Sequence, residues 1–384
     1  MTVSAILTAD NHLDPTAFNF GPDRFQRKKD HLKCFEEVVD YAKKERPQLF
    51  LVGGDLFDGM RPSNAARAAV MQDLKELAEH RVKVFAVSGH HDTPRSFEEG
   101  TSPLAVYAKS GYMHYFANPS FPETVMLEHE GLSVTITGVG HNSAHAQGDD
   151  PLTAIKTKLG GDFNIVLAHC PVQGFAGRTG DEPVIRPSSI PPEVDLLLVG
   201  HFHNHQSKKV GRTEVIYPGS TERVDFAEEE DEKGFVWVEF GKDGIVSNDF
   251  IKTDARSYRT VAIEFPDSPN PIDQLKEEVS PYFDKGLVLR VMIKGVTTPL
   301  GLAGYRRPEL YSFCQGKVFH PFIDDAKLEV RHPDRPDLGA RVTPLQELEA
   351  YFSKQMEASS DDEKAILKEA LELSRSKLQE KGAW

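Results

Sequence analysis

Short apolar runs alternate with longer amphipathic stretches in the first ninety residues of the chain. Strands are expected over residues 3–8, 49–52 and 82–87. Residues 24–44 carry apolar side chains at helical spacing until Pro47 stops the helix, and a second helix is expected to begin at Arg61. The order strand, helix, strand, helix, strand predicts a parallel sheet with right-handed crossovers.

The middle of the chain has a strand-rich pattern. A hairpin around Glu130-Gly131 and further strands are expected over residues 125–127, 132–137, 164–168, 195–199, 215–217 and 235–240. The loop over residues 174–192 is rich in Gly, Pro and Arg, and loops of this length are often functional. The charge run over residues 228–233 is most simply interpreted as a solvated turn.

The pattern restarts after Lys252. A strand over residues 260–265, a short helix around Leu275 and a strand over residues 286–293 predict a small second domain. Two capping boxes, Thr343-Pro344-Leu345-Gln346 and Ser360-Asp361-Asp362-Glu363, mark the starts of two helices. We therefore expect a first domain over residues 1–255, a small domain over residues 256–341 and a helical tail over residues 342–384.

Carboxylates and imidazoles follow the predicted strands. They are Asp10, His12, Asp55, His90, His91, His169, His201 and His203. The carboxyl ends of strands in an open α/β sheet border the crevice in which ligands bind, so these side chains are expected to converge. Asp and His together suit manganese, iron or zinc better than calcium. Their number exceeds what one ion needs, and two ions about 3.5–4 Å apart can clamp both oxygens of a phosphoryl displacement.

Composition narrows the class of protein. The 384 residues suffice for two or three domains, and no apolar run approaches membrane-spanning length. Three unclustered cysteines fit a reducing cytosol, and the first ten residues lack the features of a signal peptide, so a cytoplasmic location is expected. The formal net charge of −14 argues against nucleic-acid binding, although bound divalent ions would create a local positive site.

The order of these motifs resembles that of the calcineurin-like metallophosphoesterases. The motifs are Asp10-x-His12, Gly54-Asp55-Leu56-Phe57-Asp58, Gly89-x-His91-Asp92, His169 and Gly200-His201-x-His203. Flanking segments resemble one branch, the SbcD-type nuclease subunits of double-strand-break repair. These segments are Arg61-Pro62-Ser63, Tyr217-Pro218-Gly219-Ser220-Thr221-Glu222-Arg223 and Asp231-Glu232-Lys233-Gly234-Phe235. The resemblance covers the first 250 residues and is looser beyond them.

The resemblance implies an α/β fold, a metallophosphoesterase β-sandwich flanked by helices, with a small α+β cap domain and a C-terminal helical tail. It also implies two divalent ions, most simply Mn²⁺. One ion would be held by Asp10, His12, Asp55 and His203, and the other by Asp55, the residue at position 90, His169 and His201. His91 would protonate the leaving oxygen, paired with Asp58, because an adjacent carboxylate raises the pKa of an imidazole.

Position 90 departs from the family pattern. The family has Asn there, whereas this chain has His90. A neutral imidazole also donates a lone pair, so we hypothesise that His90 binds the second ion, with a changed metal preference or position. The competing interpretation is a weakened second site and a slow or inactive enzyme.

The predicted function is a two-metal DNA nuclease, an exonuclease, an endonuclease or both, that acts in DNA repair. The resemblance implies a coiled-coil ATPase partner of the SbcC type, docked through the tail helices, and a homodimer formed through helices of the first domain. Two alternatives stay open. One is a phosphodiesterase for small molecules or nucleotides, which would share every ligand, and the other is a DNA- or ATPase-binding module impaired by His90. The tail helices could also pack back onto their own chain.

Overall fold

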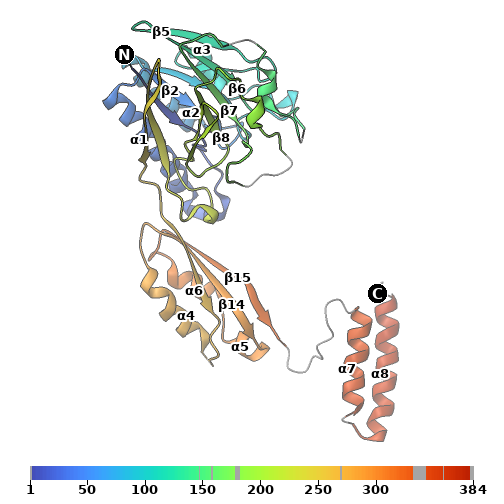
Figure 1. Ribbon diagram of the computed structural model, residues 1–384. Coiled ribbons are helices and arrows are strands. Elements are labelled where there is room, and N and C mark those ends of the chain that lie inside the picture. Colours follow the sequence, from blue (N-terminus) through green and yellow to red (C-terminus); the bar gives the residue numbers. More distant parts are fainter. Residues whose placement is uncertain are drawn as a thin grey trace. The chain divides into compact units, whose positions relative to one another are not determined.

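Two six-stranded sheets form the first part of the chain (Figure 1). The computed structural model describes residues 2–146, 148–156, 159–177, 182–268, 270–331, 343–357 and 359–380. The strands of the two sheets are β1 (Val3–Thr8), β2 (Leu49–Val52), β3 (Lys83–Ala86), β4 (His114–Tyr115), β5 (Thr124–His129), β6 (Leu132–Val139), β7 (Phe163–His169), β8 (Leu196–Gly200), β9 (Gln206–Val210), β10 (Thr213–Tyr217), β11 (Gly234–Gly241) and β12 (Gly244–Lys252).

Strand order confirms the parallel arrangement expected for the first ninety residues. The first sheet has the order β12-β11-β1-β2-β3-β4, in which β1 pairs in parallel with β2 and β2 with β3. The second sheet has the order β5-β6-β7-β8-β10-β9, with parallel pairs from β6 through β8 to β10. Within each sheet, the carboxyl ends of these parallel strands therefore lie at one edge.

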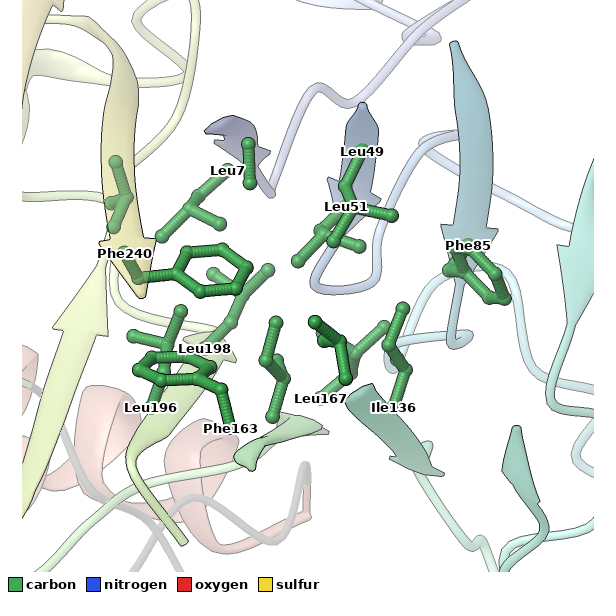
Figure 2. Packing of buried hydrophobic residues seen from close by; sticks show 14 of the residues in the cluster. Leu7, Leu49, Leu51, Phe85, Ile136, Phe163, Leu167, Leu196, Leu198 and Phe240 are labelled. Atoms are coloured by element: carbon green, nitrogen blue, oxygen red, sulfur yellow. The ribbon is translucent and has the colours of Figure 1, made fainter. Parts of the chain in front are cut away.

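The main hydrophobic core lies between the two sheets (Figure 2). Leu49 and Leu51 of β2 point into this core, whereas Phe50 and Val52 belong to the layer between the first sheet and its helices. This alternation follows from the two-residue period of a strand. The expected β-sandwich is confirmed, and its rigidity supports the loops that follow the strands.

Helices cover the outer face of the first sheet. They are α1 (Arg24–Glu45), α2 (Asn64–Glu79) and α3 (Leu104–Ser110), and residues of all three belong to the core on that face. The Oγ of Ser63 accepts a hydrogen bond from the backbone N–H of Ala66, which caps α2. Short 3₁₀ helices occupy Phe18–Asp23, Phe97–Glu99, Pro151–Ala154, Pro187–Ser189, Phe226–Glu228 and Ser280–Tyr282.

The chain divides into two compact units. One comprises Met1–Thr260, Phe283–Arg290 and Gln315–Phe322, and the other comprises Val261–Tyr282, Val291–Cys314 and Ile323–Trp384. A three-stranded sheet contains β13 (Tyr258–Glu264), β14 (Val288–Thr297) and β15 (His320–Val330), and the helices of this region are α4 (Pro271–Val279), α5 (Pro299–Ala303) and α6 (Arg307–Cys314). The three-domain division stays a prediction, and its boundary at residues 341 and 342 lies outside the described residues.

The C-terminal helices α7 (Pro344–Glu357) and α8 (Asp361–Glu380) lie side by side (Figure 1). The predicted capping box at Thr343 is confirmed, and one of the two bonds of the box predicted at Ser360 is present. The backbone N–H of Gln346 donates to Thr343 Oγ1 at 3.3 Å, and that of Thr343 donates to Gln346 Oε1 at 2.9 Å. The backbone N–H of Ser360 donates to Glu363 Oε2 at 3.0 Å. Among the described helices, none combines the length and the apolar character needed to cross a membrane.

Candidate metal centre

Three glycines make room for the buried pair Asp55 and His169. A Cβ added at Gly54 or at Gly200 would lie less than 3.0 Å from the His169 ring, and one at Gly89 would lie equally close to the Asp55 carboxylate. Each glycine directly precedes a predicted ligand in the chain. Any larger residue would push the imidazole or the carboxylate out of place, so these positions of the motifs require glycine for steric reasons.

The backbone is strained at four predicted ligands. Asp10, His12 and Asp55 have φ of 50°, 45° and 50°, and His201 has φ of 103°. Such conformations cost non-glycine residues about 1–3 kcal/mol each and persist only where the surrounding structure enforces them. Here the backbone N–H of Asp10 donates to the Gly54 carbonyl, and that of His12 donates to the Asp55 carbonyl, both at 3.0 Å. The loops after β1 and β2 therefore hold each other in place.

The first ligand group contains Asp10, His12 and His203. The Nδ1–H of His203 donates to Glu228 Oε1 at 2.7 Å, which leaves a lone pair on its Nε2. This Nε2 lies 3.1 Å from the Nε2 of His12. With metal–nitrogen bonds of about 2.1 Å, two ligands that meet at about 90° lie about 3.0 Å apart. The spacing of the two nitrogens therefore suits a shared metal ion.

The second ligand group contains His90, His169 and His201. The Nδ1–H of His169 donates to the Gly53 carbonyl at 2.9 Å, so Nε2 is the ring nitrogen that would bind a metal ion in place of its proton. This buried Nε2 lies 3.1 Å from Asp55 Oδ2. A backbone partner on the far nitrogen is the usual means of fixing the tautomer and orientation of a metal-binding imidazole.

Electrostatics at the centre demand a positive charge. Burial lowers the pKa of His169, but the charge and hydrogen bond of Asp55 outweigh burial and raise it to about 10. Burial raises the pKa of Asp55, yet the charge of His169 brings it well below its usual range. Burial also raises the pKa of Asp10. A proton on His169 thus occupies the place of a cation, and a divalent ion is the cation that this donor set suits.

All seven predicted ligands converge. Their donor atoms form three groups, each with members within 4.8 Å of one another: Asp10, His12 and His203; Asp10, Asp55 and His169; and His90, His169 and His201. Two groups share Asp10 and two share His169, so the seven side chains form one continuous cluster. The assignment of each residue to one ion stays a prediction.

The comparison with known protein families can now be added. The family model of the calcineurin-like phosphoesterases matches residues 4–205, which is more than half of the chain. This chain belongs to the calcineurin-like phosphoesterase family. The match spans every predicted metal ligand, so the phosphoesterase identity and the converging Asp and His residues describe the same part of the molecule.

Individual relatives of this phosphoesterase share about a quarter of its residues or less. It is 25% identical over 301 residues to the DNA double-strand break repair protein Mre11 of Methanopyrus kandleri, covering 74% of this chain and 63% of that protein. The Mre11 of Sulfurisphaera tokodaii is 23% identical over 313 residues, with coverages of 80% and 77%. The metallophosphoesterase YhaO of Bacillus subtilis is 24% identical over 276 residues, with coverages of 69% and 64%. This chain thus spans less than two thirds of the Methanopyrus relative, and the Mre11 relatives agree with the predicted repair-nuclease branch.

The structure changes the interpretation of Asp58 in this phosphoesterase. Asp58 Oδ1 lies 3.3 Å from His12 Nδ1 and 3.5 Å from His91 Nδ1, so the carboxylate lies within ion-pair distance of both imidazoles. The Nδ1–H of His91 donates to the backbone carbonyl of Asp58 at 3.1 Å. His91 is therefore held by the main chain as well as by the carboxylate, and its Nε2 is the atom that can reach a substrate.

His90 has two neighbours that sequence alone does not indicate. The Nε2 of His90 lies 3.5 Å from Glu182 Oε2, and the same oxygen lies 3.2 Å from His201 Nε2. The ring centroids of His90 and His141 are 3.9 Å apart. Burial lowers the pKa of His90 to about 2 and that of His201 to about 3, so both are neutral donors. The length of its loop was the signal for Glu182, and the signal for His141 was its position after a strand.

The charge run over residues 228–233 is solvated only in its middle, so the expectation of a solvated turn is wrong for its two ends, Glu228 and Lys233. Glu228 is 8% exposed and Lys233 is 2% exposed. Lys233 Nζ lies 2.7 Å from Glu228 Oε2, while the other carboxylate oxygen accepts the hydrogen bond of His203. Burial raises the pKa of Glu228, but its partners His203 and Lys233 lower it to about 2. Glu228 therefore orients a predicted ligand.

Proposed function

We propose that this phosphoesterase is a two-metal DNA nuclease that acts in DNA repair. The observation that carries the proposal is the convergence of seven Asp and His donors beside His91 at the carboxyl ends of the strands. Family membership supports phosphoester chemistry, and the relatives named as DNA double-strand break repair proteins support DNA as the substrate. The mixed carboxylate and imidazole donors suit manganese, iron or zinc, and we propose manganese on the family resemblance.

The proposed mechanism divides the work among the residues of this centre. Asp55 would help to hold both ions, and His169 is held against it by the Gly53 carbonyl. Two divalent ions would supply an activated water and neutralise charge on the phosphate when bound. His91, oriented through its Nδ1, presents Nε2 to the scissile phosphate and donates a proton to the leaving oxygen.

The decisive experiment compares manganese-dependent cleavage of linear double-stranded DNA by the wild type and by His91→Ala, with bound metal quantified in both. We expect cleavage to fall about 10²-fold or more while two ions remain bound, because His91 moves a proton and holds no metal. His114→Ala, at a histidine that belongs to none of the ligand groups, is the matched control. Cleavage by His91→Ala at the wild-type rate would contradict the proposed role.

One observation favours a second function. The net charge of −14 suits small phosphodiesters better than a long polyanion. The same preparation should therefore also be assayed with a small chromogenic phosphodiester. Hydrolysis of that compound without DNA cleavage would favour a small-molecule or nucleotide phosphodiesterase. A wild type that binds at most one ion and cleaves neither substrate would favour a binding module impaired at His90.

We also propose that α7 and α8 dock on a coiled-coil ATPase partner of the SbcC type and that the protein forms a homodimer. Tyr351, Ile366 and Leu373 on these helices are 55%, 69% and 69% exposed. Large apolar side chains at this exposure are typical of a helix face that binds a partner. The dimer rests on the family resemblance alone, and analytical ultracentrifugation of the purified chain would test it.

A further inference from the structure

A pocket lies at the edge of the sandwich where the strands of the first sheet begin, the edge opposite to the metal centre. Its volume is about 350 Å³, within the range of about 300–1,000 Å³ typical of small-molecule sites. Val3 begins β1 and Leu49 begins β2, and both line the pocket with Val134 of β6. These three buried side chains belong to the core between the sheets. The floor of the pocket is therefore apolar and rigid.

Basic side chains surround this apolar floor. Arg46, Arg81 and Lys83 line the pocket and are exposed, and the imidazoles of His80 and His129 also line it. The only carboxylate among the lining residues belongs to Glu128. Within the described part of the chain, no carboxylate forms an ion pair with either arginine or with the lysine. Such a basic rim in a protein of net charge −14 leaves positive charge available for an anion.

Both arginines have an unusual backbone. Arg46 ends α1 with φ of 54°, and Arg81 follows the end of α2 with φ of 64°. Helices commonly place glycine at a left-handed position like this, because glycine adopts it without strain. Here the chain carries a long guanidinium at both helix ends instead of the residue that suits the backbone. Strain that is retained at two neighbouring positions points to a functional use of the two side chains.

We propose that this pocket binds a nucleoside monophosphate. The phosphate would contact Arg46 and Arg81, because the planar guanidinium fork matches phosphate oxygens. The base would lie against the half-buried Leu127 of β5, above the buried floor of Val3, Leu49 and Val134. The volume of about 350 Å³ admits one nucleotide. This site shares no lining residue with the metal centre, so it does not depend on the proposed nuclease activity.

The test uses a variant that removes the charges and relieves the backbone. In Arg46→Gly/Arg81→Gly, the melting temperature should stay the same or rise, because glycine accepts both φ values. Affinity for dAMP, measured by calorimetry on the manganese-loaded full chain, should fall about tenfold or more. Arg46→Lys/Arg81→Lys should keep more of the affinity than the glycine variant. Lys44→Ala/Lys109→Ala, at exposed lysines that do not line the pocket, should bind dAMP like the wild type.

Two further measurements separate this pocket from the metal centre, which can also bind phosphate. An azido derivative of dAMP should cross-link to peptides that contain residues 46–49, 80–83 or 127–134. Deoxyadenosine and inorganic phosphate should each bind more weakly than dAMP, since each lacks one of the two contacts. Cross-linking confined to the metal-binding loops, unchanged affinity in the glycine variant, or equal affinity for phosphate alone would overturn the proposal. So would a parallel loss of DNA cleavage in the glycine variant, which would assign these arginines to the path of DNA.

Discussion

The metal centre and the tail helices α7 and α8 both depart from the usual pattern of buried apolar and exposed polar side chains, in opposite directions. At the metal centre, charged groups such as Asp55 and His169 are buried, and the backbone of several ligands is strained. On α7 and α8, apolar side chains such as Ile366 and Leu373 are exposed. The helix starts in the tail are nevertheless well capped and require no strained backbone. The metal centre thus buries charged groups, whereas the tail helices expose apolar side chains.

The difference indicates what each region binds. Buried carboxylates and imidazoles are costly unless charge is balanced, so the metal centre calls for a cation. Covering exposed leucine and isoleucine with another apolar surface lowers the free energy, which agrees with the proposed docking of the tail on a protein partner. A substitution at the metal centre should therefore alter chemistry and metal content. A substitution on the tail face should alter assembly and leave chemistry intact.

Asp55→Asn should have the largest effect. We expect DNA cleavage to fall about 10³-fold or more, because Asp55 is the carboxylate proposed to bind both ions and several kcal/mol of charge stabilisation would depend on them. Bound metal, measured by mass spectrometry, should fall below two ions per chain.

The control for this substitution is another buried carboxyl group. Burial raises the pKa of Asp73 on α2 to about 7, so its side chain is already partly neutral near physiological pH. Asp73→Asn should leave cleavage and metal content unchanged. Equal loss of metal in both variants would mean that any buried carboxylate supports the fold and that Asp55 has no special role.

Glu228→Gln should have an intermediate effect. The substitution keeps the size of the side chain but removes the charge that orients His203 through its Nδ1. Removing such an outer partner commonly costs about 10–100-fold in metal affinity. Manganese titration by calorimetry measures this loss, and Glu230→Gln, at an exposed position of the same charge run, is the matched control. An unchanged manganese affinity would refute the orienting role. A lower melting temperature of the metal-free variant would assign Glu228 to the fold.

The sequence predicted the metal ligands because each follows an apolar strand or a glycine. Strand periodicity places His169 and His201 at strand ends, and parallel pairing then brings those ends to one edge. Gly54 and Gly200 were visible as glycines next to Asp55 and His201. The alternation of apolar residues predicted a parallel sheet, whereas the β-sandwich was implied only by the family resemblance. The local pattern was therefore sufficient to predict the residues that directly follow a strand or a glycine.

Residues whose role depends on distant partners could not be predicted. The burial of Glu228 and Lys233 arises because His203, from another strand end, lies against them, and their own segment has only the pattern of a polar turn. Asp58 was expected beside His91, yet it also lies beside His12, which is 46 residues away in the chain. Tertiary packing decides these contacts, and no local periodicity encodes them.

Ile366→Ser/Leu373→Ser on α8 should have the smallest effect on stability and should affect assembly alone. Both side chains are mostly exposed, so the free energy of unfolding should change by about 0.5 kcal/mol or less. DNA cleavage by the isolated chain should stay at the wild-type level. Co-purification with an SbcC-type ATPase should be lost, as in a chain that ends at Arg341. Lys368→Ser, at an exposed polar position of the same helix, should retain the complex. Full retention of the complex by both the serine double variant and the shortened chain would show that the tail does not dock the partner.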